Sequence, residues 1–179
     1  MIDLQKKSKF HYPTPDAVID IIAHAYINGT QIGWDGTRNE CFYMAPENIN
    51  DNGVIDPPRC NPNDPVSSCA VGVLLRNAGF DAEQLWDDGI RNEDPADKVA
   101  IQYDIRIADW GDSRTHRFLQ SCQTLHDRFA ASDAANAMSS KALGYMFRLM
   151  APALISASAN ANSADAALLR RAIDRAFKY

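Results

Sequence analysis

Four long segments of the chain combine a helix-start signal with apolar residues at helical spacing, and they restrict the fold to a mainly α-helical one. They span residues 14–28, 113–131, 133–150 and 165–177. In the first, Thr14-Pro15-Asp16 supplies a hydroxyl N-cap, a proline at the first helical position and an acid in the first turn. Because each apolar stripe must be buried against another element, we expect a mostly α-helical, compact bundle.

Shorter helices are expected between these segments. Ser67 or Ser68 is predicted to cap a helix that ends at Gly79, and Asp81 to cap a second, shorter one. The stretch Val99–Trp110 is ambiguous, because its alternating apolar residues fit a strand while Val99, Tyr103 and Ile107 fit one face of a helix. Helical neighbours favour a helix there. Pro152 is expected to kink or end the helix that precedes it.

Residues 29–66 are rich in glycine, proline, asparagine and aspartate, which predicts turns rather than regular structure. Only Gln31–Trp34 and Cys41–Met44 resemble strands, so a short β-hairpin is expected in this region. A long irregular loop inside a compact domain usually has a functional role. Its aromatic residues Trp34, Phe42 and Tyr43 are interpreted either as part of the core or as a surface that binds a partner.

The length of 179 residues predicts one domain. Within it we distinguish an N-terminal arm (1–12), the loop-rich insertion (29–66), and a C-terminal linker and helix (157–179). The net charge of −5 argues against general nucleic-acid binding as the function. The chain also begins without the apolar run of a signal peptide and holds no segment suited to span a membrane. We expect a cytoplasmic protein.

Cys69 is the strongest candidate for a reactive side chain. It follows a polar loop and lies near the start of a capped helix, where unpaired N–H groups and the helix dipole favour a thiolate. His126-Asp127, on a later helix, could supply a base. These three residues would suit a cysteine-dependent hydrolase or transferase. The alternative is that Cys69 is a small buried apolar residue and that His126 caps the edge of the core.

Four thiols raise the alternative of a zinc-stabilised binding domain. Its candidate ligands are Cys41, Cys60, Cys69 and Cys122. The spacing argues against such a site, because the chain has no Cys-x-x-Cys pair and no His-x-x-x-His. It also has no nucleotide-binding fingerprint or serine-hydrolase elbow. We therefore expect four reduced cysteines and no cofactor.

Three short motifs occur one after another along the chain. They are Cys41-Phe42-Tyr43, the run Cys69-Ala70-Val71-Gly72-Val73-Leu74, and Leu119-Gln120 followed by Leu125-His126-Asp127. Across residues 16–128 the chain resembles small uncharacterised proteins of bacteriophages and prophages with Cys-x-Tyr, Cys-Ala-Val-Gly-x-Leu and Leu-Gln-x-x-His-Asp motifs. Here the stretch between Cys41 and Cys69 is longer, and the Leu-Gln pair lies further from His-Asp.

The resemblance implies a phage accessory protein, a class whose members often bind and block a host protein. From the residues themselves, Ala70 and Gly72 allow another element to approach the start of their helix closely. We expect the helix with Cys122, Leu125 and His126 to be that element. The expected function is that of a non-enzymatic protein-binding module, directed at a host-encoded protein or defence system. The loop and the acidic surface would make the contact.

Overall fold

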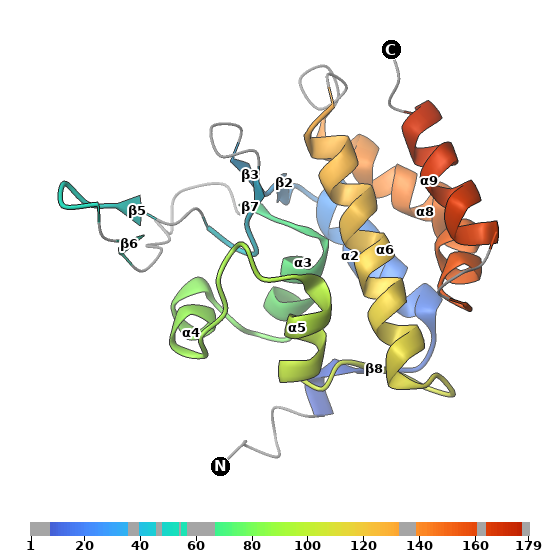
Figure 1. Cartoon of the computed structure of the whole chain (residues 1–179), viewed down its shortest axis with the longest axis horizontal. Coiled ribbons are helices and arrows are strands. Elements are labelled where there is room, and N and C mark those ends of the chain that lie inside the picture. The colour runs from blue at the N-terminus through green and yellow to red at the C-terminus, as the bar shows by residue number, and fades with distance from the viewer. Residues whose placement is uncertain are drawn as a thin grey trace.

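A computed structural model describes residues 8–35, 40–45, 48–53, 55–56, 67–132, 139–160 and 164–176. The helices within them are η1 (Ser8–Phe10), α2 (Pro15–Ile27), α3 (Ala70–Asn77), α4 (Ala82–Asp87), α5 (Ala96–Gln102), α6 (Asp112–Ala130), α8 (Ser140–Ala157) and α9 (Ala164–Ala176). The protein is therefore mostly α-helical, as the sequence predicts (Figure 1).

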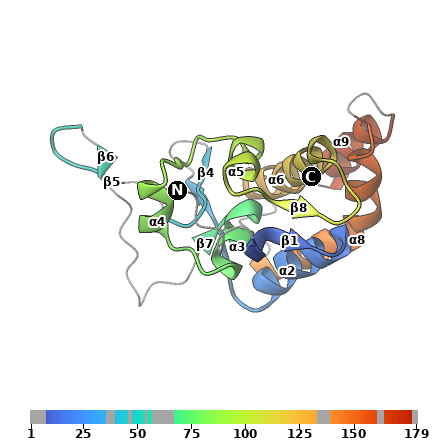
Figure 2. The same ribbon diagram turned by 90° about the horizontal axis from the view of Figure 1, so that it is seen from below.

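The long helices lie at one end of the molecule, and the short helices and hairpins lie towards the other. Helix α8 packs against α2, α6 and α9, while α3 packs between α2 and α6. The contact of α8 with α2 is the most extensive and passes over Gly144, where a Cβ atom would lie 2.6 Å from the carbonyl oxygen of Ala23. Seen from below, α8 and α9 occupy one end and β5–β6 the opposite end (Figure 2).

Four two-stranded pairs accompany the helices. Two are parallel, joining β1 (His11–Tyr12) to β8 (Arg106–Ile107) and β2 (Gln31–Ile32) to β7 (Ser67–Ser68). Two are antiparallel, joining β3 (Trp34–Asp35) to β4 (Glu40–Cys41) and β5 (Asn48–Ile49) to β6 (Ile55–Asp56). The β3–β4 pair is the hairpin expected in the loop region. The parallel pairs tie together segments that are far apart in the sequence.

Several helix ends follow from local capping. The Thr14 Oγ1 accepts a hydrogen bond from the Ala17 N–H at the start of α2, and Asp81 and Gln84 form a complete capping box at α4. Two caps differ from the expectation. Ser67 and Ser68 form strand β7, which pairs with β2, so Cys69 is the N-cap of α3. Gly111, rather than Asp112 or Ser113, is the N-cap of α6.

The stretch Val99–Trp110 is only partly helical, so the expectation of one helix there was wrong. Helix α5 ends at Gln102, and Arg106–Ile107 forms β8. The chain turns at Asp104 and Asp109, which have positive φ angles of 51° and 62°. Asparagine and aspartate adopt this left-handed conformation more readily than most residues. The pairing of β8 with β1 stabilises the extended segment between these turns.

Of the predicted N-terminal arm (1–12), residues 8–12 are packed into the fold, and residues 1–7 lie outside the described residues. Phe10 is fully buried and stacks with Phe80 and Tyr103 at centroid distances of 5.5 Å. Tyr12 is buried as well and belongs to β1. Residues 8–12 are therefore an integral part of the folded core.

Helix α8 continues through Pro152 to Ala157, so the expected end at this proline was wrong. The predicted start at Asp133 lies outside the described residues, and the described helix begins at Ser140. No helix in the described ranges is long and apolar enough to cross a membrane.

Pro152→Ala is expected to stabilise the protein. Pro152 is exposed inside α8, and proline lacks the N–H that would otherwise bond to the carbonyl of Arg148. Alanine restores this bond and removes the ring, so we expect the free energy of unfolding to rise by about 1–3 kcal/mol. Urea denaturation followed by circular dichroism measures the change. An unchanged or lower value would show that the proline is fully accommodated.

Candidate functional site

Two cysteines, Cys41 and Cys69, lie where β4 meets the start of α3. Cys69 is the N-cap of α3, and its Sγ accepts a hydrogen bond from the Gly72 N–H at 3.4 Å. Its backbone N–H donates to the carbonyl oxygen of Phe42 at 3.0 Å, which fixes it beside the residue that follows Cys41. The Cys69 side chain is fully buried, and Cys41 is half-buried.

One turn of α6 faces these thiols. The Gln123 Nε2 donates to the Cys41 Sγ at 3.0 Å and to the Asp127 Oδ1 at 2.7 Å. The Gln123 Oε1 accepts from the Val71 N–H in the first turn of α3, at 3.4 Å. Gln123 therefore connects β4, α3 and α6 through one side chain.

His126 is the buried base of this cluster. Its side chain is fully buried, and its Nδ1 lies 3.0 Å from the Asp127 Oδ1, whose side chain is 38% exposed. The ring stacks on that of Tyr26 at a centroid distance of 6.1 Å. The Nε2 is buried and has no hydrogen-bond partner among the described residues. A buried polar atom in this state is uncommon and needs an explanation.

Two of the thiols, those of Cys41 and Cys122, have raised pKa values. The hydrogen bond with the Cys69 thiol, followed by burial and the charge of Asp127, raises the pKa of Cys41 far above its usual range. Burial alone raises the pKa of Cys122, which lies in the core of α6 away from this cluster.

The structure brings the predicted residues Cys69, His126 and Asp127 into one neighbourhood, with Cys41 and Gln123 between them. No hydrogen bond recorded among the described residues joins Cys69 to His126 directly, and both side chains have zero exposure. A substrate could not reach this pair in the folded state. Of the four predicted metal ligands, only Cys41 belongs to the group of three mutually close ligand atoms, which Cys41 forms with His126 and Asp127. Cys69 lies beside Cys41, Cys122 is outside that group, and Cys60 lies outside the described residues.

Sequence reasoning missed Gln123 and selected Gln120 instead. Gln120 is exposed, whereas Gln123 is buried and contacts both Cys41 and Asp127. The sequence did contain an indication of Gln123. Residues three apart on a helix share a face, and Gln123 stands three residues before His126. Gln123 therefore has the spacing to His126-Asp127 that the Leu-Gln-x-x-His-Asp motif requires.

The aromatic residues of the loop have different environments. Phe42 and Tyr43 are 7% and 3% exposed, so they are part of the core and not a binding surface. The Tyr43 hydroxyl donates to the carbonyl oxygen of Asp94 at 2.5 Å, and its N–H donates to the Asn92 Oδ1. Trp34 is half-buried. The interpretation of all three residues as a binding surface is therefore wrong for Phe42 and Tyr43.

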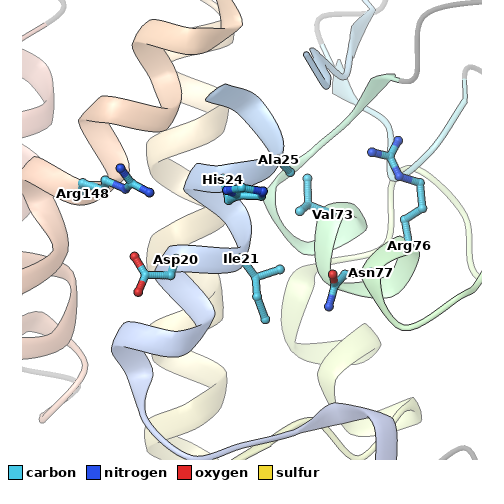
Figure 3. A pocket seen from close by; sticks show the side chains of 8 residues that line it. All are labelled: Asp20, Ile21, His24, Ala25, Val73, Arg76, Asn77 and Arg148. Atoms are coloured by element: carbon cyan, nitrogen blue, oxygen red, sulfur yellow. The ribbon is translucent and has the colours of Figure 1, made fainter. Parts of the chain in front are cut away.

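A groove of about 420 Å³ lies on the opposite side of α2 from the cluster's histidine ring. It runs across α2 between α8 and α3, with Arg148 entering from α8 and Arg76 and Asn77 from α3 (Figure 3). Asp20 and His24 contribute polar groups from α2, with apolar surface beside them. This groove could not be predicted from the sequence, because its walls come from three separate helices.

No family model, no curated protein and no solved structure matches the chain.

Proposed function

We propose that the protein binds a protein partner through the outer face of α8 and the adjoining groove, and that it is not an enzyme. The partner segment would carry acidic and apolar side chains. The observation that carries this proposal is the exposure of large apolar residues on α8. Tyr145 is 52% exposed and Leu149 is 75% exposed.

These apolar residues lie together on the surface. Tyr145 and Leu149 are four residues apart, and Pro152, also exposed, is three residues further along, so all three share one face of α8. Large exposed apolar residues on one helix face are characteristic of docking sites. The opposite face of α8 packs on α2 and α6, which keeps the exposed face rigid.

Charge indicates the kind of partner. Helix α8 contains Lys141 and Arg148 but no acidic residue, in a chain whose net charge is −5. Arg148 also borders the groove together with Arg76 and His24, and Asp20 supplies the one carboxylate among the residues that line it. This basic and apolar region is complementary to an acidic segment, since opposite charges at an interface favour association.

The alternative of a cysteine-dependent enzyme has less support. A nucleophile must contact its substrate, and Cys69 is fully buried with no described cavity shown to open onto it. The resemblance to phage proteins adds the suggestion that the partner is a host protein. In that case binding itself would produce the biological effect.

The proposal predicts that partner capture depends on α8. The wild-type chain, Tyr145→Ser/Leu149→Ser and Ile101→Ser would each be immobilised and exposed to bacterial host lysate. Ile101 is a matched control, because it is 64% exposed but lies on α5. We expect one protein to be retained by the wild type and Ile101→Ser and to be reduced at least tenfold on the double variant. Quantitative mass spectrometry measures the retention.

Salt and charge provide the second readout. The retained protein should dissociate more readily as ionic strength rises. Arg148→Gln should weaken retention of the same protein even at low salt. Equal retention by all three chains, or a partner insensitive to both changes, would contradict the proposal. Circular dichroism confirms that the exposed-site variants remain folded.

A further inference from the structure

Three ligand types gather at the cluster beside β4. One ligand atom each from Cys41, His126 and Asp127 lies within 4.8 Å of the other two. Thiolate, imidazole and carboxylate are the donors that zinc uses in proteins, and tetrahedral geometry places them roughly 3.4–3.8 Å apart. The three atoms lie within 4.8 Å of one another, and the His126 Nδ1 lies 3.0 Å from the Asp127 Oδ1, so small shifts would let the three residues surround an ion.

Cys69 is positioned to be the fourth donor. Its backbone N–H donates to the carbonyl oxygen of Phe42, the residue after Cys41, which places Cys69 beside Cys41. Its sulfur is not one of the three mutually close ligand atoms. Cys69 is also the N-cap of the eight-residue helix α3, where the helix dipole favours a negatively charged sulfur. A contraction of the cluster would bring both thiols to the same ion.

The unpartnered nitrogen of His126 is a second, independent indication. The ring is fully buried, its Nδ1 contacts Asp127, and its Nε2 has no hydrogen-bond partner among the described residues. Coordination of a metal by Nε2 itself would remove the cost of this orphaned atom. Gln123, bonded to both Cys41 and Asp127, holds two of the donors in place.

We propose that Cys41, Cys69, His126 and Asp127 bind one Zn²⁺ ion. Two sulfur donors and an imidazole favour zinc over the harder ions magnesium and calcium. Binding would release the two thiol protons to solvent, so that both sulfurs coordinate as thiolates. Four protein ligands complete the tetrahedral shell, which makes the site structural rather than catalytic.

This ligand set differs from the four-cysteine alternative that the sequence suggested. Cys122 is excluded because it is buried outside the cluster, and two α6 residues take part instead. The ion would join β4, the start of α3 and the middle of α6. It would thereby hold the loop region against the helical bundle. Partner binding at α8 uses other residues, so the two proposals can fail separately.

The test uses the full chain freed of metal with a chelator and then titrated with Zn²⁺ or Co²⁺. We expect one zinc per chain by elemental analysis and an increased melting temperature with bound zinc. The cobalt form should show sulfur-to-metal charge transfer and the intense bands of tetrahedral coordination. Cys41→Ala and Asp127→Asn should each weaken zinc binding at least tenfold. Asp127 is partly exposed, so its variant should remain folded.

Cys122→Ala and Cys60→Ala are the matched controls and should retain one zinc each. Absence of zinc binding by the folded wild type would overturn the proposal. Loss of zinc with either control would also overturn it, by identifying a different ligand set. A Cys41–Cys69 disulfide in the freshly purified protein, found by mass spectrometry without metal, would replace the metal site with a covalent link.

Discussion

Gly72→Ala should leave little folded protein, because the added methyl group has no space. A Cβ atom at position 72 would overlap the carbonyl oxygen of Tyr43 and lie 2.6 Å from its carbonyl carbon. The Ser68 Oγ, which donates to the same carbonyl, closes the other side. Since the obstacle is backbone rather than a mobile side chain, we expect a loss of more than about 4 kcal/mol. Typical domains have only about 5–15 kcal/mol of stability.

Gly111→Ala is the matched control. It introduces the same methyl group at a helix N-cap where no atom lies within 4 Å, so its cost should stay below about 1 kcal/mol. Denaturation monitored by circular dichroism compares the two variants with the wild type. A Gly72→Ala protein of near wild-type stability would show that the loop carrying Tyr43 is not fixed against α3.

Alkylation of Cys69 and Cys122 in the metal-free native protein should be slower than in the unfolded chain by about 1,000-fold. Both side chains have zero exposure, so iodoacetamide can reach them only after local opening. An opening that costs about 4 kcal/mol lowers the rate by this factor, at 1.4 kcal/mol per tenfold. Burial also raises the pKa of Cys122, which further reduces its thiolate population near neutral pH.

Peptide mass spectrometry follows each cysteine separately, with the urea-unfolded chain as the reference at the same pH. Rapid native alkylation of Cys69 together with protection of Cys122 would favour the enzyme alternative. In that case the N-cap position would be supplying an accessible, activated thiol. Equal protection of both residues would identify Cys69 as a structural residue or metal ligand.

The long helices could be predicted because their signals are local. Thr14 and Pro15 mark the beginning of α2, and the Asp81 capping box marks α4. Both depend on side chains within one turn of the helix end. The stretch containing β8 could not be predicted in the same way. Its extended conformation depends on pairing with β1, which lies about 95 residues earlier in the chain.

The candidate site was predicted in part. The positions of Cys69 and His126-Asp127 were selected from residue type and helix position, and the fold brings them into one cluster. The contact partner of Gly72 was not foreseen. We expected a helix, but the close approach is made by the Tyr43 carbonyl of the loop. Sequence spacing indicates which residues share a helix face, but it does not indicate which distant backbone packs on that face.

The stretch of chain between Tyr43 and Ser68 has its two ends fastened together. The Phe42 carbonyl accepts a hydrogen bond from the Cys69 N–H, and the Ser68 hydroxyl donates one to the Tyr43 carbonyl. The entropy of closing such a loop grows slowly, by about 0.6 kcal/mol for each doubling of length. Insertions and deletions here should therefore accumulate during evolution at little cost to the bundle. For protein engineering, the same position offers an insertion point for a foreign peptide.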